Sequence, residues 1–235
     1  MHHGNEKDNG ASCHTQDAFE HERMFVLPQG NHLLSLMTVL RDAKTNSTLF
    51  AETTERVGDQ LIAAALDFVP AEKTPVVSPT GSTYQGMRHT APVCGVSILR
   101  AGASLENAMR RGYAGPLSFG KVLIQRDEET CQPKLFYSKF PPNIASQRVM
   151  VLEPMLATGG SACAAINVIK AQGVPEENII FVNVLASRYG AKTLFSRFPQ
   201  IRLVTAAVDE DMTLSNHIDP GLGDFGDRFY GTYDS

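Results

Sequence analysis

The residues best suited to chemistry lie where a short apolar run ends in an acidic residue and a glycine-rich turn. Residues 149–152 are apolar, Glu153 follows them, and Thr158-Gly159-Gly160-Ser161 comes shortly after. Glycines and hydroxyl side chains at the start of an expected helix leave backbone N–H groups free to bind a phosphate. Glu153, at the end of the expected strand, could hold sugar hydroxyls. The pattern therefore fits a ligand that contains both a phosphate and a ribose.

Spacing alone does not separate this hypothesis from an ordinary glycine turn, in which Thr158 or Ser161 simply caps a helix. The turn contains neither G-x-x-x-x-G-K-[ST] nor G-x-G-x-x-G. It is therefore neither a P-loop nor a dinucleotide-binding fingerprint. The surrounding chain has to decide between a ligand site and a plain turn.

Strands and helices are expected to alternate along most of the chain. Apolar periodicity predicts helices at 32–41, 49–68, 105–111, 161–172 and 191–198, strands at 94–99, 121–125, 148–152, 179–185 and 202–207, and a small hairpin around 79–82. Such alternation predicts an α/β fold with a parallel sheet covered on both faces. Ligands of these sheets bind beyond the carboxyl ends of the strands. Candidate site residues therefore lie at 100–102, 126–129, 153–161 and after residue 207.

Four segments at those positions resemble, in the same order, the motifs of uracil phosphoribosyltransferases, which are type I phosphoribosyltransferases. They are residues 98–102, 125–130, 153–161 and 220–228. The last one, Pro-Gly-Leu-Gly-Asp-Phe-Gly-Asp-Arg, resembles the family's uracil-recognition tail and is the most diagnostic. The resemblance spans roughly residues 31–233. It implies a phosphoribosyltransferase-type fold, with a central, mostly parallel sheet flanked by helices, N-terminal helices and a small β-arm or hood.

The resemblance also implies a reaction and assigns residues to it. The enzyme would convert uracil and 5-phospho-α-D-ribose 1-diphosphate (PRPP) to UMP and diphosphate, a step of pyrimidine salvage. Asp224 and Arg126 would be catalytic. The PRPP-binding residues would be Arg100, Arg126, Glu153, Pro154, Met155, Leu156, Ala157, Thr158, Gly159, Gly160, Ser161 and Asp224. The uracil-binding residues would be Ile218, Gly223, Asp224 and Phe225. Mg²⁺ would be the cofactor, bound mainly through the substrate diphosphate rather than by fixed metal ligands.

Two residues depart from the family pattern. Glu153 stands where relatives usually have aspartate, and His217 stands where they often have tyrosine. Neither change removes a required functional group. A non-catalytic, nucleotide-sensing regulator on the same fold remains an alternative to the enzyme. The sequence also leaves open whether GTP acts as an effector and whether the chain forms a homodimer or a homotetramer.

Composition limits the partners and the location. The 235 residues carry a formal net charge of -4, so no broad basic field favours nucleic acid. No apolar run reaches the roughly 20 residues of a membrane span. The polar N-terminus and four scattered cysteines favour a cytoplasmic protein with reduced thiols. Residues 1–22 are expected to be a disordered leader, and residues 23–235 a single phosphoribosyltransferase domain.

Overall fold

The centre of the molecule is a mostly parallel β-sheet. The computed structural model describes residues 21–126 and 133–233. Its strands are arranged in the order β1 (Met24–Val26), β10 (Arg202–Asp209), β9 (Ile179–Ser187), β7 (Arg148–Leu152), β4 (Val93–Leu99), β5 (Leu117–Arg126) and β6 (Pro133–Lys139), with β8 (Met155–Leu156) pairing to β9. Only β6 runs antiparallel to its neighbour among these pairs. The carboxyl ends of the parallel strands therefore lie along one edge.

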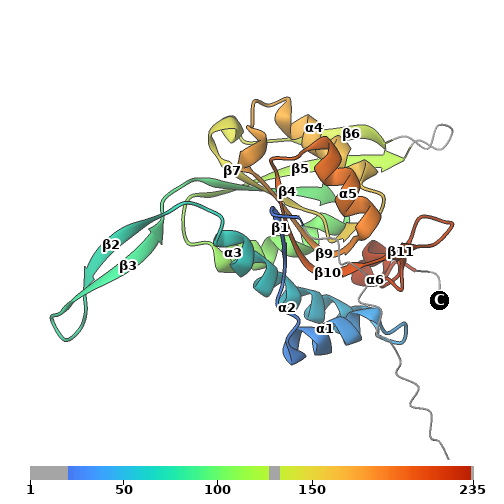
Figure 1. Cartoon of the computed structure of the whole chain (residues 1–235), viewed down its shortest axis with the longest axis horizontal. Helices are drawn as coiled ribbons and strands as arrows, with labels where there is room; N and C mark the ends of the chain where they lie inside the picture. Colours follow the sequence, from blue (N-terminus) through green and yellow to red (C-terminus); the bar gives the residue numbers. More distant parts are fainter. Residues whose placement is uncertain (1–20, 127–132, 234–235) are drawn as a thin grey trace, which may run out of the picture.

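Helices cover both faces of the sheet, as the alternating pattern predicts (Figure 1). One face packs against α1 (Asn31–Arg41), α2 (Ser47–Leu66) and α3 (Glu106–Gly112), and the other against α4 (Gly160–Lys170) and α5 (Arg188–Arg197). Side chains alternate across each strand, so Val182 and Val184 join the α2 cluster while Phe181 joins the α4 cluster. The predicted three-layer α/β fold is confirmed.

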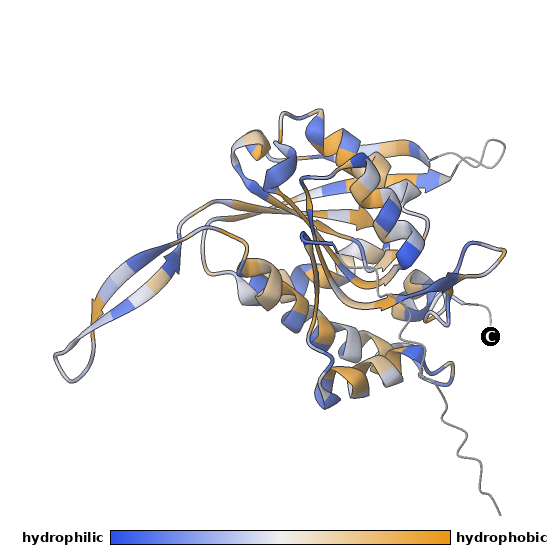
Figure 2. Cartoon of the chain, viewed as in Figure 1, coloured by the Kyte–Doolittle hydropathy of each residue, from blue (hydrophilic) through white to orange (hydrophobic). Residues whose placement is uncertain are grey.

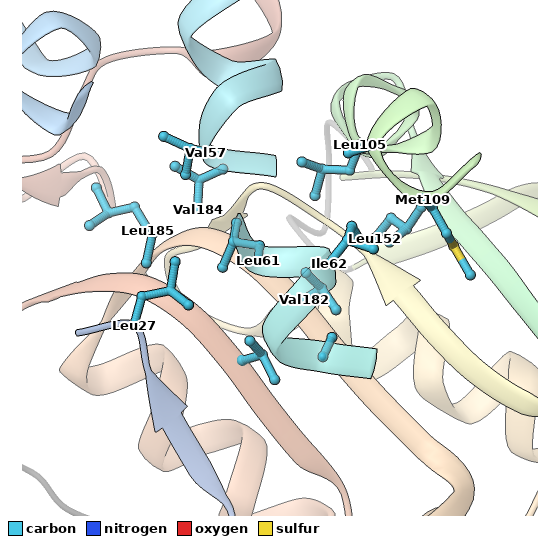
Figure 3. Close-up of a cluster of buried hydrophobic side chains, with 14 of the residues drawn as sticks. Leu27, Val57, Leu61, Ile62, Leu105, Met109, Leu152, Val182, Val184 and Leu185 are labelled. Atoms are coloured by element: carbon cyan, nitrogen blue, oxygen red, sulfur yellow. The ribbon is translucent and has the colours of Figure 1, made fainter. Parts of the chain in front are cut away.

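Helix α2 is the largest contributor to the first face. Asn46 caps its first turn by accepting a hydrogen bond from the backbone N–H of Leu49 at 2.9 Å. Val57, Leu61 and Ile62 are fully buried. Their helical spacing turns them toward the sheet, where they pack among Leu152, Val182 and Val184 (Figure 3).

A two-stranded arm extends away from the sheet. It consists of β2 (Ala71–Val77) and β3 (Thr83–His89), which pair in antiparallel fashion and lie at the left of Figure 1. The predicted hairpin is therefore confirmed and is longer than its turn signals indicate. Apolar residues concentrate on the central strands (Figure 2), yet Val77, Tyr84 and Met87 of the arm are exposed.

Several elements were not predicted. Strand β6 and the C-terminal elements β11 (Asp211–Met212), β12 (Ile218–Asp219) and α6 (Phe225–Tyr230) are too short or too polar to show a clear period. The expected leader lies almost wholly outside the described residues. Within the described part of the chain, no helix is long and apolar enough to cross a membrane.

Candidate active site

The predicted phosphate-binding turn joins β7 to α4. Gly159 precedes the first residue of α4 and has φ 80°, a left-handed conformation that glycine adopts without strain. A Cβ atom there would lie 3.3 Å from the carbonyl oxygen of Gly190. No side chain caps this helix start. The backbone N–H groups of Ser161 and Ala162 come before the first i→i−4 bond of α4, which runs from Cys163 N–H to Gly159 O at 2.9 Å, so they have no intrahelical partner and are suited to an anion.

Glu153 occupies the end of β7 and lines a cavity. Its backbone N–H donates to Val182 O at 3.2 Å, which holds the residue at the edge of the sheet. Its side chain is half-buried and lines the cavity. Loss of hydration raises the pKa of this carboxyl group to about 8. Burial therefore favours the protonated form of Glu153 in the ligand-free protein.

The cavity brings the two predicted binding sets together. It has a volume of about 210 Å³. One wall is formed by residues of the 153–161 stretch, namely Glu153, Met155 and Ala157, and the other by Ile218, Gly223, Asp224 and Phe225. Asn216, His217, Gly226 and Ala101 complete it. Segments that are more than 50 positions apart in the chain thus enclose one space.

An ion pair that the sequence did not indicate anchors the glycine-rich tail at residues 220–228. Arg41, at the end of α1, binds Asp209, at the end of β10, with Nη2–Oδ1 at 2.7 Å. Both side chains also bind the backbone of Gly221. Arg41 Nη1 donates to the carbonyl oxygen of Gly221 at 2.8 Å, and the N–H of Gly221 donates to Asp209 Oδ2 at 2.9 Å. Gly221 has φ 59°, and a Cβ atom there would lie 2.1 Å from Ile218 O. The tight turn and the ion pair together fix the path of the tail.

Arg228 ties the same tail to the N-terminal helices. Its Nη1 donates to Leu222 O at 2.6 Å and its Nη2 donates to Asp42 O at 2.6 Å. Its Cζ lies 4.4 Å from the centre of the Phe50 ring. Burial lowers the pKa of this guanidinium. The arginine of the tail motif is thus a structural link between α1, α2 and the cavity wall.

Asp224 lies at the cavity and starts α6. Its Oδ1 accepts a hydrogen bond from the backbone N–H of Asp227 at 2.9 Å, so the carboxylate caps the helix. The cap fixes the orientation of the side chain. The second carboxylate oxygen, Oδ2, accepts no hydrogen bond from the described residues.

Of the two predicted diphosphate-binding arginines, the structure describes the side chain of Arg100 but not that of Arg126. Arg100 follows β4 and its side chain is exposed; it contacts α6 rather than lining the cavity. The side chain of Arg126 lies outside the described residues, so its roles remain predictions. Pro154, Thr158 and Gly159 lie in the connection beside the cavity, Gly160 and Ser161 begin α4, and none of them lines the cavity. Leu156 is on β8 and is buried in the core on the α4 side.

Comparison with known proteins agrees with the geometry. The sequence model of the family described as "Uracil phosphoribosyltransferase" matches residues 27–232. The chain is 41% identical over 211 residues to uracil phosphoribosyltransferase 2 of Schizosaccharomyces pombe, covering 90% of this chain and 96% of that protein. It is 41% identical over 213 residues to uracil phosphoribosyltransferase of Dictyostelium discoideum, covering 91% of this chain and 98% of the relative.

A solved structure supports the same conclusion for the fold. The AQ2163 protein from Aquifex aeolicus superposes with a TM-score of 0.79 at 26% sequence identity, covering 90% of this chain and 100% of that one. The family match spans both walls of the cavity, from the 153–161 stretch to the glycine-rich tail. The chain therefore belongs to the uracil phosphoribosyltransferase family.

Proposed function

We propose that this protein transfers a 5-phosphoribosyl group from PRPP to uracil, releasing UMP and diphosphate. The observation that carries the proposal is the single cavity lined by both Glu153 and Asp224, one from each predicted binding set. A site of this kind can hold a ribose phosphate and a base against each other. The alternative of a non-catalytic regulator receives no support from the relatives, which are described as uracil phosphoribosyltransferases.

Each part of PRPP has a suitable counterpart. The 5-phosphate binds the N–H groups at the start of α4, beside Thr158 and Ser161. The carboxyl group of Glu153 accepts hydrogen bonds from the ribose hydroxyls, and their binding favours its ionised form. Arg100 donates to the diphosphate, because a guanidinium fork matches phosphate oxygens. The same role is predicted for Arg126.

The reaction breaks the bond between C1′ and the diphosphate oxygen, forms a bond from C1′ to N1 of uracil, and releases the N1 proton, which the departing diphosphate can take up. Positive charge develops on the ribose as the diphosphate leaves. Asp224 belongs to the cavity wall that the tail forms, and its carboxylate can stabilise the positive charge on the ribose. Positioning and charge stabilisation therefore account for most of the protein's contribution.

Backbone groups of the tail would recognise uracil. Uracil presents one N–H donor between two carbonyl acceptors, and the backbone groups of Ile218, Gly223 and Phe225 can complement this edge. Glycine at 223 permits a close approach because it has no side chain. Cytosine has the opposite polarity at two of these positions and leaves groups unpaired.

Mg²⁺ is the cofactor that this chemistry requires, and the residues fit it. Mg²⁺ usually keeps several waters and binds substrate phosphates together with one or two carboxylates. Glu153 and Asp224 are the carboxylates of the cavity. When bound, the ion neutralises charge on the diphosphate.

We also propose that the arm mediates a homodimer. An isolated two-stranded hairpin is marginally stable in water. Val77, Tyr84 and Met87 are 75%, 65% and 63% exposed, so the arm offers apolar surface to a second copy. Light scattering should give twice the chain mass for the parent protein and the single chain mass for Val77→Asp/Tyr84→Asp. A monomeric parent would refute the dimer.

The function is tested directly by incubating the purified protein with uracil, PRPP and Mg²⁺, with and without GTP. We expect UMP and diphosphate in equal amounts, and no product when Mg²⁺ is omitted. Absence of UMP under all these conditions would refute the enzymatic function.

A further inference from the structure

The guanidinium of Arg100 is held by the C-terminal segment. Its Nη2 donates to Asp227 Oδ1 at 2.8 Å and its Nη1 donates to Thr232 Oγ1 at 3.2 Å. Thr232 Oγ1 also donates to the same Asp227 oxygen at 2.6 Å. The three side chains therefore form a closed group, in which each one contacts the other two.

The backbone of Arg100 is held by the same segment. Tyr230, on α6, donates its hydroxyl proton to Arg100 O at 3.2 Å. Its ring centre lies 5.8 Å from Arg100 Cζ. The segment from Asp227 to Thr232 thus contacts both ends of this arginine, although 127 positions separate Arg100 from Asp227.

The contacts leave part of the guanidinium available. An arginine side chain has five N–H donors. Asp227 and Thr232 each take one, at the two Nη atoms. Within residues 21–126 and 133–233, the Nε–H of Arg100 donates to no partner, and each Nη retains a second hydrogen. The remaining donors can bind a diphosphate while the Asp227 contact stays in place.

Asp227 is linked to the cavity as well. Its backbone N–H donates to Oδ1 of Asp224, a carboxylate that lines the cavity, at 2.9 Å. Gly226 lies between Asp224 and Asp227 in the chain. A Cβ atom at Gly226 would be 3.4 Å from Asp224 Oδ1 and 3.5 Å from Arg100 Nη2. The C-terminal helix therefore sets the position of Arg100 relative to the reacting centre.

We propose that Asp227 and Thr232 are positioning residues, which orient Arg100 so that its free N–H groups meet the diphosphate of PRPP. The inference rests on the proposed function, since it requires that Arg100 bind the diphosphate. A carboxylate that fixes a guanidinium reduces the number of conformations that the arginine loses when the ligand binds. Asp227 itself need not touch the substrate.

The test compares KM for PRPP with KM for uracil in Asp227→Ala, Thr232→Val and Thr232→Ser. Exposed ion pairs contribute modestly, so we expect Asp227→Ala to raise KM for PRPP about threefold to fivefold and Thr232→Val about twofold. Thr232→Ser retains the hydroxyl and should match the parent. KM for uracil should stay unchanged in all three variants, which a general loss of structure would not produce.

An ion pair between α2 and α3 provides a matched control. Arg111 Nη2 and Asp59 Oδ1 also form an exposed pair at 2.8 Å, with Asp59 51% exposed. Asp59→Ala should leave KM for PRPP unchanged. In the double variant Asp227→Ala/Thr232→Val, KM should rise no more than in Asp227→Ala, because both residues act through the same group.

Failure of this inference differs from failure of the proposed function. If the parent makes UMP and Arg100→Ala raises KM for PRPP while Asp227→Ala does not, the positioning role is wrong. A lower KM for PRPP in Asp227→Ala would show that Asp227 competes with the diphosphate, and would also overturn it. Calorimetric titration with PRPP and Mg²⁺ tests the same weakening in a protein that makes no UMP.

Discussion

The ion pair between Arg41 and Asp209 should control both stability and uracil recognition, and Asp209→Asn tests this. The change keeps the shape of the side chain and removes its charge. Only 7% of the Asp209 side chain and 26% of the Arg41 side chain are exposed. The variant therefore leaves a largely buried guanidinium without its counter-charge, in contact with the turn at Gly221.

The expected size of the effect follows from that burial. Breaking a fully buried pair costs about 3–5 kcal/mol. Because Arg41 is partly exposed, we expect about 2–3 kcal/mol for Asp209→Asn. For a chain of this size each kcal/mol lowers Tm by about 2–4 °C, so Tm should fall by about 5–10 °C. The loosened turn should also raise KM for uracil about tenfold, with little change in KM for PRPP.

Thermal unfolding of the ligand-free protein and steady-state kinetics provide the two measurements. The control is Glu52→Gln, because Glu52 and Arg56 form a pair at 3.8 Å with both side chains more than half exposed. Such pairs contribute roughly 0–1 kcal/mol, so Tm should change by about 4 °C or less. An Asp209→Asn protein with the Tm and uracil KM of the parent would refute the anchoring role.

Four further predictions concern the cavity and the phosphate turn. The raised pKa of Glu153, about 8 in the folded protein against 4.5 ordinarily, means that stability falls as pH rises between these values, because only the folded state keeps the proton. Glu153→Gln should remove this slope in denaturant unfolding at pH 5 and pH 9. In the parent we expect calorimetry at pH 7 to show proton release on PRPP binding, and Glu153→Gln should abolish it; an unchanged slope would contradict the assignment. Gly159→Ala should raise KM for PRPP, because the turn needs φ 80° at this position, which alanine adopts only with strain, and the new Cβ would lie 3.3 Å from Gly190 O. An unaffected KM would show that the turn does not bind the phosphate. The parent should use uracil at least about a hundredfold better than cytosine, since each unpaired polar group costs about 1–3 kcal/mol; efficient use of cytosine would exclude base recognition by the tail. Asp224→Asn should lower kcat in a UMP assay while Tm changes little; full activity of this variant would exclude the catalytic role of Asp224.

Features with a local cause were predictable from the sequence. The helix expected at 32–41 is observed at Asn31–Arg41, and the strand expected at 148–152 has those same bounds. Apolar periodicity and capping residues act within a few positions, so a single sequence reveals them. The expected helix at 49–68 shifts by about one half-turn, since Asn46 caps it earlier.

The connections among site residues were not predictable. Arg41 and Asp209 are 168 positions apart, and nothing in the spacing of either residue indicates the other. Asp209 ends a strand and Arg41 ends a helix, which are common positions for charged residues. Only the packing of α1 beside the carboxyl end of β10 turns them into an anchor for Gly221.

The order of residues along the chain supplies the chemical groups of the site. They are a glycine-rich turn with free N–H groups, a carboxyl group after a strand, and a tail of glycines and carboxylates. These depend on residue type and local order. The tertiary structure decided how those groups behave. Burial raises the pKa of Glu153, and the docking of α6 places Asp227 against Arg100. Hydration and distance depend on segments far apart in the chain, so they exist only once the sheet and its helices have assembled.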